Sequence, residues 1–444
     1  MNKPNVIVIM TDDQGYGDLS CMGATDFVTP HLDEMARSGA RFSCMYSNSP
    51  VCSPSRASLL TGRYPGYAGV RAILAGHRRA SGLTPAAPTF GTALRKEGYH
   101  TGIVGKWHLG LAENSRPLHN GFDQFYGFMA GCIDYYSHIF YWGMADGHTN
   151  PTHDLWDNEN EVYRNGEYMT DLITRKSVEY IQEHKQEPFL LYVGYNAPHY
   201  PMHAPEKYLK RFAHLPWDRQ IMTAMISAVD DGVGEIRAEL ERQGLLENTL
   251  IYFQSDNGPS RESRNWLDGR EDPYYGGTSG HFTGHKFSLF EGGVRIPAMV
   301  SWPAAIPAGQ VIDTPCASMD VFPTLLDAVG GDASAYELDG HSILSMLQTG
   351  KPVEHDQLFW EMEQQTAMRQ GDYKLVLNGA LVEGEPAKDP VFLSNLADDP
   401  GEKHNLAQEM PELTQQMTRD ALAWRKALEE NWDQKFASNY KSLT

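Results

Sequence analysis

A cysteine and an arginine lie close together in the segment 49–65, which reads SPVCSPSRASLLTGRYP. Ser53 is a suitable N-cap, and the proline after it suits the first turn of a helix, so the segment predicts a helix that ends at Gly62. Cys52 then lies at the positive end of this helix, and Arg56, one turn along, can reach the same bound anion. The segment therefore predicts an anion-binding corner that contains a thiol.

Two other interpretations of Cys52 stay open at this point. A buried cysteine beside a capped helix is the commoner use of an isolated cysteine. A thiolate nucleophile with a lowered pKa, as in cysteine phosphatases, would also be placed at a helix start. The residue types in the segment do not separate these possibilities.

Acidic pairs follow two strand-like runs of the chain. Asp12 and Asp13 come after NVIVIM, and Asp256 and Asn257 come after a run that ends in IYFQ. Adjacent carboxylates repel each other unless a cation neutralises them, and oxygen ligands suit Ca²⁺ or Mg²⁺ better than zinc. The crevice beyond the carboxyl ends of strands is where open α/β sheets bind ligands. Each pair alone could also be an ordinary turn, but their repetition favours a metal site.

The elements that must position these residues alternate between strand and helix along most of the chain. Apolar runs such as NVIVIM and PFLLYVG alternate with helical patterns such as TDLITRKSVEYIQEH and MTAMISAVDDGVGEIRAELERQG. This alternation predicts the α/β class, with a large, mixed but mostly parallel sheet sandwiched by helices. The segments 110–165 and 258–285 have weak periodicity and are expected to be loops that form part of the site.

The pattern changes after about Gly350. QLFWEM, QTAMRQ, YKLVLN and VFLSNL are short strand-like runs separated by turns, and a polar helix is expected near 411–430. These runs predict a small antiparallel sheet with a terminal helix. The chain is accordingly divided into a catalytic α/β domain, 1–350, and a smaller α+β subdomain, 351–444.

Composition narrows the functional classes. The 444 residues carry a formal net charge of −20, which makes nucleic acid an unlikely partner. No stretch approaches the roughly 20 apolar residues of a membrane span. The five scattered cysteines contain no CxxC pair and indicate reduced thiols. The chain opens on a strand pattern, so a cytoplasmic protein is expected, or a periplasmic or secreted one whose leader has been removed.

The cysteine motif resembles a known family signature. Cys52-Ser53-Pro54-Ser55-Arg56, followed by LTGR, resembles the signature of the type I sulfatases, which belong to the alkaline phosphatase superfamily. TDDQGYGDL, GKWHLG, APHYP, SDNG, GHKFSLFEGGVRIP and NLADDPGEKHNL resemble further blocks of that family and occur in the family order. The resemblance spans nearly the whole chain and implies an alkaline-phosphatase-like fold and an arylsulfatase-like sulfuric ester hydrolase.

The resemblance also implies cofactors and a maturation step. In this family a formylglycine-generating enzyme reads the Cys-x-Pro-x-Arg core and oxidises the cysteine to formylglycine (3-oxoalanine). The family ligand set maps onto Asp12, Asp13, Asp256 and Asn257, with an oxygen from the modified Cys52. Ca²⁺ is the usual ion and Mg²⁺ is possible, in agreement with the oxygen-rich donor set.

The family mechanism assigns a role to each remaining residue. The aldehyde hydrates to a geminal diol, one hydroxyl attacks sulfur, and the alcohol leaves. Loss of the proton from the second hydroxyl then expels sulfate and restores the aldehyde. The resemblance implies these roles: Asp256 as base for the attack, His108 as base for sulfate expulsion, His199 with Lys286 as donor to the leaving oxygen and holder of sulfate, and Arg56 and Lys106 as holders of formylglycine that spread its charge.

Basic and aromatic residues of the loops suit a sulfated carbohydrate or another sulfated small molecule, with aryl sulfates as artificial substrates. The candidates for substrate binding are Ser137, His138, Arg71, His203, Arg261, Arg264, Trp266 and His285, with His77, Arg78, Arg270, His281, Tyr135, Tyr136 and Trp142 as further members. Surface residues without function are expected among them. Two alternative functions remain: a phosphonate or phosphate diester hydrolase on the same scaffold, and a non-catalytic glycan-binding relative.

Overall fold

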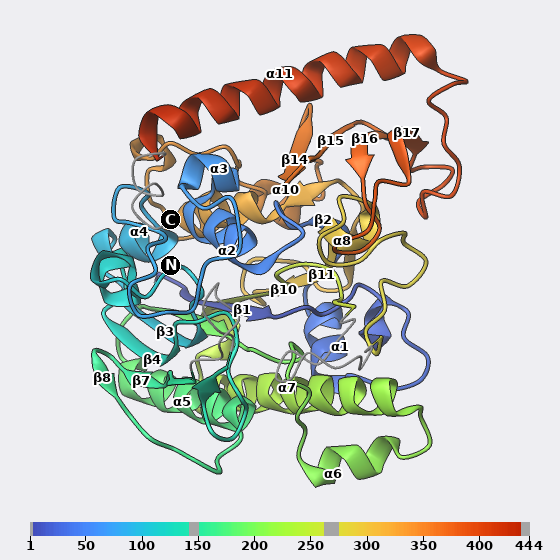
Figure 1. Cartoon of the computed structure of the whole chain (residues 1–444). Coiled ribbons are helices and arrows are strands. Elements are labelled where there is room, and N and C mark those ends of the chain that lie inside the picture. Colours follow the sequence, from blue (N-terminus) through green and yellow to red (C-terminus); the bar gives the residue numbers. More distant parts are fainter. Residues whose placement is uncertain (1–2, 142–150, 262–274, 437–444) are drawn as a thin grey trace.

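The computed structural model describes residues 3–141, 151–261 and 275–436. These residues form a large central sheet covered by helices, and a separate four-stranded sheet near the C-terminus (Figure 1). The α/β fold with an added antiparallel sheet is therefore confirmed.

The central sheet has 11 strands in the described part of the chain and is mixed, with a parallel centre and antiparallel pairs on both sides of that centre. Parallel pairs join β10, β1, β9, β3 and β4, whereas β11 runs antiparallel to both of its neighbours. The strands in spatial order are β12 (Gln310–Ile312), β2 (Ala40–Tyr46), β11 (Arg295–Ser301), β10 (Thr249–Ser255), β1 (Asn5–Thr11), β9 (Phe189–Gly194), β3 (His100–Lys106), β4 (Gln124–Phe128), β7 (Trp156–Asp157) and β8 (Asn160–Glu161), with β13 (Cys316–Ala317) beside β2.

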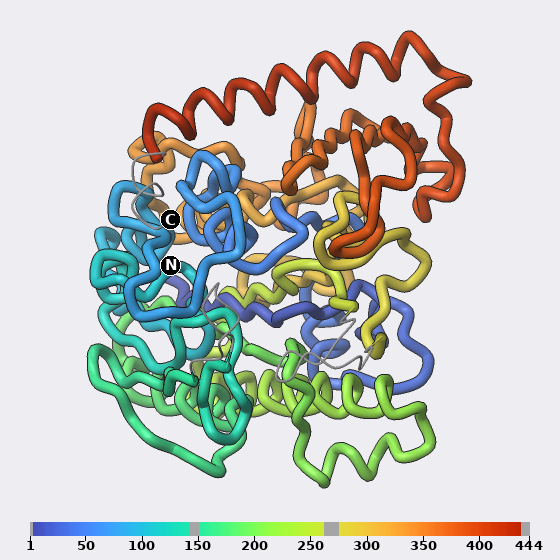
Figure 2. The backbone as a smooth tube through the Cα atoms, in the orientation of Figure 1, coloured from blue at the N-terminus to red at the C-terminus, as the bar shows by residue number. Residues whose placement is uncertain are grey.

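Helices bury both faces of this sheet, which is why β1 is apolar at nearly every position. Val6 and Val8 pack into the core on one face, and Ile7 and Ile9 into the core on the other. In Figure 2 the green helices α5 and α7 lie on one side of the sheet and the blue α2 on the other. The first core is covered by α2 (Cys52–Thr61), α4 (Phe90–Lys96), α9 (Val321–Ala328) and α10 (Leu344–Thr349), and the second by α1 (Pro30–Arg37), α5 (Met169–His184) and α7 (Trp217–Arg242).

The C-terminal sheet is antiparallel throughout, as the short runs predict. Its order is β14 (Leu358–Met362), β15 (Gln365–Gln370), β16 (Tyr373–Gly379) and β17 (Asp389–Asn395). The long helix α11 (Pro411–Lys435) packs across this sheet and against the short helix α3 (Pro65–Ala68), so the sheet is tied to the N-terminal part of the chain (Figure 1). A domain division at residue 350 stays a prediction.

Some elements had no clear sequence signal. β2 and β4 were not predicted, and β4 lies inside the segment 110–165 that was expected to be a loop. The remaining short elements are α6 (Glu206–Leu209), α8 (Glu291–Val294), β5 (Ile139–Phe140) and β6 (Thr152–His153). A search of the described residues finds no helix with the length and apolarity that crossing a membrane requires.

Candidate active site

The two acidic pairs meet at one edge of the central sheet. Asp12 and Asp13 directly follow β1, and Asp256 and Asn257 directly follow β10, its parallel neighbour. The amide of Asp13 donates a hydrogen bond to Oδ1 of Asp256 at 3.1 Å. All four side chains are buried. The sheet therefore brings the acidic pairs together where the sequence placed them.

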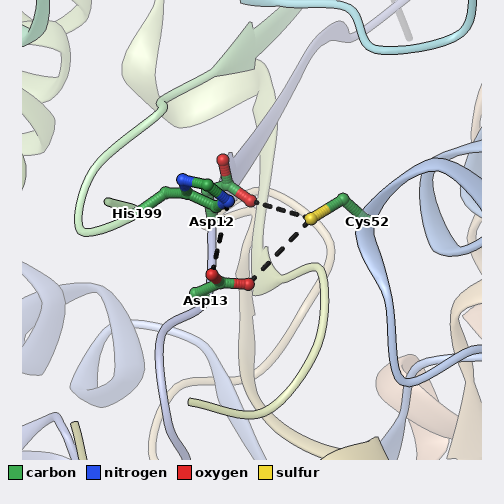
Figure 3. A group of neighbouring side chains, drawn as sticks. All are labelled: Asp12, Asp13, Cys52 and His199. Carbon is green, nitrogen blue, oxygen red and sulfur yellow. Dashed lines mark hydrogen bonds and ion pairs between the residues drawn. The ribbon is translucent and has the colours of Figure 1, made fainter. Parts of the chain in front are cut away.

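Cys52 is the first residue of α2 and faces the Asp12–Asp13 pair. Its Sγ lies 3.4 Å from Oδ1 of Asp12 and 4.0 Å from Oδ1 of Asp13. Figure 3 shows the thiol pointing towards both carboxylates. The predicted N-cap was wrong, because Val51 is the N-cap, the helix starts two residues earlier than predicted, and Ser53 lies inside it. The Ser53 hydroxyl instead accepts a hydrogen bond from the amide of Leu74. The predicted end of the helix at Gly62 is confirmed by the left-handed conformation of that glycine (φ 67°).

The surroundings of Cys52 disfavour a thiolate. Burial raises the pKa of the Cys52 thiol well above its usual value, and Asp12 and Asp256 raise it further. Lys106 and Lys286 act in the opposite direction but do not outweigh these effects. The unmodified cysteine is thus held as a neutral thiol beside carboxylates, which argues against the cysteine-phosphatase type of chemistry.

Two lysines and a histidine surround the Asp12–Asp13 pair. Nζ of Lys106 donates a hydrogen bond to Asp12, and Nζ of Lys286 donates one to Oδ2 of Asp13 at 2.8 Å. His199 lies with Nε2 3.5 Å from the same oxygen and 3.3 Å from Nζ of Lys286. Burial raises the pKa of Asp13, but Lys286 and His199 outweigh it and lower the pKa to about 2. Asp13 is therefore a carboxylate at neutral pH.

His199 is oriented by a backbone carbonyl. Its Nδ1 donates to the oxygen of Tyr200, which leaves Nε2 as the acceptor towards Lys286. Burial is the main cause that lowers the pKa of His199 to about 4, with Lys286 contributing to the decrease. In this arrangement Lys286 carries the proton of the pair and His199 is neutral.

Arg56 lies behind the carboxylates and is fully buried. Its Nη2 and Nε donate to Oδ2 of Asp256 at 2.8 and 3.1 Å, and Nη1 donates to the carbonyl of Lys106 and the hydroxyl of Tyr192 at 3.3 Å each. Burial raises the pKa of Asp256 to about 7, and Asp12 adds to the increase. Tyr192 was not identified from the sequence because a tyrosine in an apolar strand carries no functional signal.

The side chains of this edge could hold a divalent cation. The ligand atoms of Asp12, Asp13, Cys52 and His199 lie within 4.8 Å of one another. The side-chain amide of Asn257 donates to Oδ1 of Asp13 at 2.7 Å, whereas its own Oδ1 is buried and has no hydrogen-bond partner among the described residues. Two carboxylates beside an unpartnered amide oxygen fit a hard cation such as Ca²⁺ or Mg²⁺. The oxygens of Asp256 face Arg56 and the Asp13 amide in this structure, so its role as a ligand stays a prediction.

His108 lies close to the start of α2 through a loop contact. Its Nε2 is 3.3 Å from the carbonyl of Leu74, the residue whose amide binds Ser53. Its Nδ1 is buried and has no hydrogen-bond partner in the part of the chain that the structure describes. Burial lowers the pKa of His108 well below its usual value, and Lys106 and Arg56 lower it further. His108 is therefore neutral and able to accept a proton.

Several predicted substrate residues make contacts that favour structural roles. Arg71 donates to Glu361 in β14 at 2.7 Å and lies 3.8 Å from Glu429 in α11. His138 is fully buried, with Nε2 3.1 Å from the carbonyl of Glu167. His203 lies 3.4 Å from Asp134. These contacts join each loop to a neighbouring part of the chain.

Other predicted substrate residues are more accessible or lie outside the described residues. Ser137 is half-buried, with its hydroxyl 3.4 Å from that of Tyr141. Arg261 is exposed and lies over the ring of Tyr275. His285, beside Lys286 in the chain, has its pKa lowered to about 4 by burial and by Arg261. Outside the described residues lie Arg264, Trp266, Arg270 and Trp142.

Comparison with known proteins identifies the family. The sequence model described as sulfatase matches residues 4–331, which is most of the chain. This chain belongs to the sulfatase family. A second model, described as the C-terminal part of N-sulphoglucosamine sulphohydrolase, matches residues 277–427.

Individual relatives agree with this assignment. N-acetylgalactosamine-6-sulfatase of Mus musculus is 33% identical over 392 residues, covering 84% of this chain and 71% of the relative. Arylsulfatase D of Homo sapiens is 30% identical over 420 residues, with coverages of 78% and 68%. Among solved structures, Ps i-CgsB superposes with a TM-score of 0.83 at 31% identity, covering 95% of this chain and 93% of that one.

The family settles the class of reaction. The chain is a sulfuric ester hydrolase with an alkaline-phosphatase-like fold, as the motifs implied. Sulfatases in general use a metal and a formylglycine, and the side chains around Cys52 fit the metal.

Proposed function

We propose that this sulfatase removes sulfate from a carbohydrate, with Cys52 as the precursor of its nucleophile and Ca²⁺ at the Asp12–Asp13 edge. The observation that carries the proposal is the convergence of Cys52, two carboxylates and the Lys286–His199 pair at the ends of β1 and β10. Relatives named for sulfated sugars support the substrate class: one is N-acetylgalactosamine-6-sulfatase, and Ps i-CgsB has been solved in complex with k-i-k-neocarrahexaose.

Cys52 itself is suited to be a precursor rather than the working group. Burial keeps its thiol protonated, and its Sγ lies beside carboxylate oxygens, where a thiolate would be repelled. The Cys-x-Pro-x-Arg core supports maturation by a formylglycine-generating enzyme. The hydrated aldehyde would supply a hydroxyl for attack on sulfur and a second hydroxyl whose deprotonation releases sulfate. An oxygen would then take the place that Sγ occupies beside Asp12 and Asp13.

A divalent cation would be held by Asp12, Asp13 and Asn257, with Asp256 as the fourth candidate, and would supply positive charge against the sulfate oxygens. The unpartnered Oδ1 of Asn257 supports this set. Arg56 fixes the carboxylate of Asp256 through two hydrogen bonds and positions it for a role as base near the nucleophile. Lys106 neutralises Asp12 and contributes a positive charge beside the proposed nucleophile.

The remaining residues handle protons and the sulfate group. Lys286 carries the proton that it shares with His199, so this pair is suited to protonate the leaving oxygen and to hold the sulfate. His108 is neutral, and its Nδ1 is available as an acceptor, which suits the base that releases sulfate.

A substrate screen tests the proposal. The chain is coexpressed with a formylglycine-generating enzyme, the peptide that contains Cys52 is examined by mass spectrometry, and free sulfate is measured with defined sulfated mono- and oligosaccharides. We expect conversion of Cys52 and release of sulfate from at least one sugar. A fully converted enzyme that cleaves only aryl sulfates would contradict the carbohydrate assignment.

Two alternative functions are separated by the same preparation. Comparing the sulfate ester and the phosphate diester of one phenol tests a phosphonate or phosphate diester hydrolase, for which diester turnover would be faster. A Cys52 that remains a thiol in the presence of the modifying enzyme would favour a non-catalytic glycan-binding protein.

A further inference from the structure

Lys286 begins a short segment, residues 286–290 (the Lys286 segment), that contacts the loop after β10 and the loop before α2. Its amide donates to the carbonyl of Pro259, and the amide of Phe287 donates to the carbonyl of Pro50, each at 3.0 Å. Phe287 has a positive φ of 72°. A left-handed conformation is unfavourable for a bulky residue and persists only where its surroundings hold it.

The C-terminal sheet provides much of that support through Gln365, the first residue of β15. Its Nε2 donates to the carbonyl of Phe287 at 2.8 Å, and its Oε1 accepts from the amide of Leu289 at 3.4 Å and from that of Ala380 at 3.1 Å. Ser288 donates to the carbonyl of Ala380 at 2.7 Å. One buried amide side chain thus binds backbone on both sides of Ser288 and joins it to Ala380, the residue directly after β16.

The same contacts connect Gln365 to the reactive groups through the backbone. The carbonyl that accepts from Gln365 belongs to Phe287, which directly follows Lys286, and Nζ of Lys286 is 2.8 Å from Asp13 and 3.3 Å from His199. Packing reinforces the connection, because Phe290 contacts the ring of Phe392 in β17 at 5.1 Å between centroids. In Figure 1, α8, which follows this segment, lies between the C-terminal strands and the central sheet.

We infer that Gln365 is a positioning residue for Lys286, and that the C-terminal sheet completes the active site by holding the Lys286 segment in its left-handed turn. The inference rests on the role proposed above for Lys286. It assigns to the C-terminal sheet a task in the reaction in addition to its contribution to stability. Gln365 does not touch the nucleophile or the carboxylates, so its effect passes through the lysine.

A double-mutant cycle tests this inference. Gln365→Met keeps the side-chain length and removes all three hydrogen bonds, and we expect kcat/KM on an aryl sulfate to fall about 10- to 100-fold through misplacement of Lys286. In a Lys286→Met background the same substitution should change kcat/KM by less than about 2-fold, because the two residues act as one unit.

The matched control is Thr366→Val, on the adjacent residue of β15. Its hydroxyl accepts from Arg425 of α11, so the substitution disturbs the same strand on the side away from Lys286. We expect Thr366→Val to lower the melting temperature about as much as Gln365→Met does. Its kcat/KM should stay within about 2-fold of that of the parent enzyme. Two results would overturn the inference. One is that Gln365→Met lowers kcat/KM as much in the Lys286→Met background as in the parent enzyme, and the other is that Thr366→Val lowers kcat/KM as much as Gln365→Met does.

Hydrogen exchange provides a readout that does not depend on sulfatase activity. Amides of the segment 286–290 should exchange faster in Gln365→Met than in Thr366→Val. If the converted parent enzyme releases no sulfate, the proposed function fails, and this measurement alone decides whether Gln365 holds the segment. Equal exchange in the two variants would overturn the inference even in an active enzyme.

Discussion

Two buried groups of charged side chains lie at the two ends of the Lys286 segment. The active-site cluster consists of Asp12, Asp13, Asp256, Arg56, Lys106 and Lys286. The junction cluster lies between the central and C-terminal sheets and consists of Glu291, Glu402, Lys374, Arg295 and Arg369. In both, the carboxylates and all of the cations except the partly buried Arg295 are buried, so burial of charge alone does not distinguish a reactive site from a structural one.

The pairing of the charges does not distinguish them either, but the neutral groups beside the carboxylates do. In the junction cluster, Lys374 contacts both Glu291 (2.8 Å) and Glu402 (3.3 Å), and Arg295 contacts Glu291 at 3.0 Å. Each acid thus faces a base from another element, as expected of a structural ion network. In the active-site cluster each carboxylate also has a cation: Lys106 for Asp12, Lys286 for Asp13 and Arg56 for Asp256. Here, however, Asp12 and Asp13 also lie beside the Cys52 thiol, and Asp13 lies beside the Asn257 side chain, whose oxygen has no hydrogen-bond partner among the described residues. A cation would complete this set of converging ligand atoms.

The largest effect is expected from removal of the Cys52 thiol, which the active-site cluster surrounds. Cys52→Ala should lower sulfatase turnover by at least about 10⁴-fold, since the nucleophile is lost, while carbohydrate binding persists. The free energy of unfolding should change by about 1 kcal/mol or less, because the thiol makes only weak hydrogen bonds. Cys316→Ala, at a buried cysteine in β13, should keep full turnover. Sulfate release by Cys52→Ala would refute the assignment of the nucleophile.

Removal of the cation should have the next largest effect. Treatment with a chelator is expected to lower turnover about 100-fold or more, since the cation's charge would no longer stabilise the transition state. Added Ca²⁺ should restore turnover and raise the melting temperature through binding to the folded state. The calcium-dependent rise should vanish in Asp13→Asn and persist in Glu402→Gln of the junction cluster. A rise that persists in Asp13→Asn would place the cation elsewhere.

Breaking the junction cluster should affect stability more than chemistry. Lys374→Met leaves Glu291 and Glu402 buried without their ammonium partner, and such a loss typically costs about 3–5 kcal/mol of unfolding free energy. Denaturant unfolding measures this loss, and kcat per folded molecule at low temperature should stay within about 10-fold of the parent. Lys388→Met, at a lysine near the start of β17 that lies over Phe392, is the control and should be nearly neutral. An equal loss of unfolding free energy in Lys374→Met and Lys388→Met would contradict a stabilising role of the junction cluster.

The grouping of the active-site cluster could be predicted from the sequence, and the roles of its residues stay predictions; the junction cluster was not predicted at all. Asp12, Asp13, Asp256 and Asn257 could be placed because strand ends are readable from apolar runs, and parallel neighbours bring those ends together. Cys52 could be identified from its motif. The N-cap at Ser53 was wrong because a tertiary contact, the amide of Leu74, uses that hydroxyl.

The residues that sequence reasoning missed act through contacts between distant elements. Tyr192 and Gln365 lie in strands, and their hydrogen bonds to Arg56 and Phe287 depend on how sheets and loops pack. Arg71 carried an apparent signal for anion binding, yet its guanidinium is held by Glu361, nearly 300 positions away in the chain. A single sequence gives no information about such partners, which is why the basic loop residues were the weakest prediction.

The smallest expected effect concerns the titration of Glu402. Burial raises the pKa of Glu402 from its ordinary 4.5 to about 7; Lys374 opposes this shift and Glu291 reinforces it. Between pH 4.5 and 7 the folded protein then holds a proton that the unfolded chain has lost, so stability falls as pH rises through this window. Glu291 behaves in the opposite way, because Lys374 and Arg295 outweigh burial and lower its pKa to about 2, so it adds stability as pH rises from 2 to 4.5.

Glu402→Gln should remove the falling part of this profile. The stability of the parent protein relative to Glu402→Gln is expected to decrease by about 1–3 kcal/mol between pH 4.5 and 7, measured by denaturant unfolding at several pH values. Glu409→Gln, at an exposed glutamate of the same region, should leave the pH dependence unchanged. Parallel profiles for the parent and Glu402→Gln would mean that Glu402 is ionised in the folded protein, and that the junction cluster holds two full carboxylates against its cations.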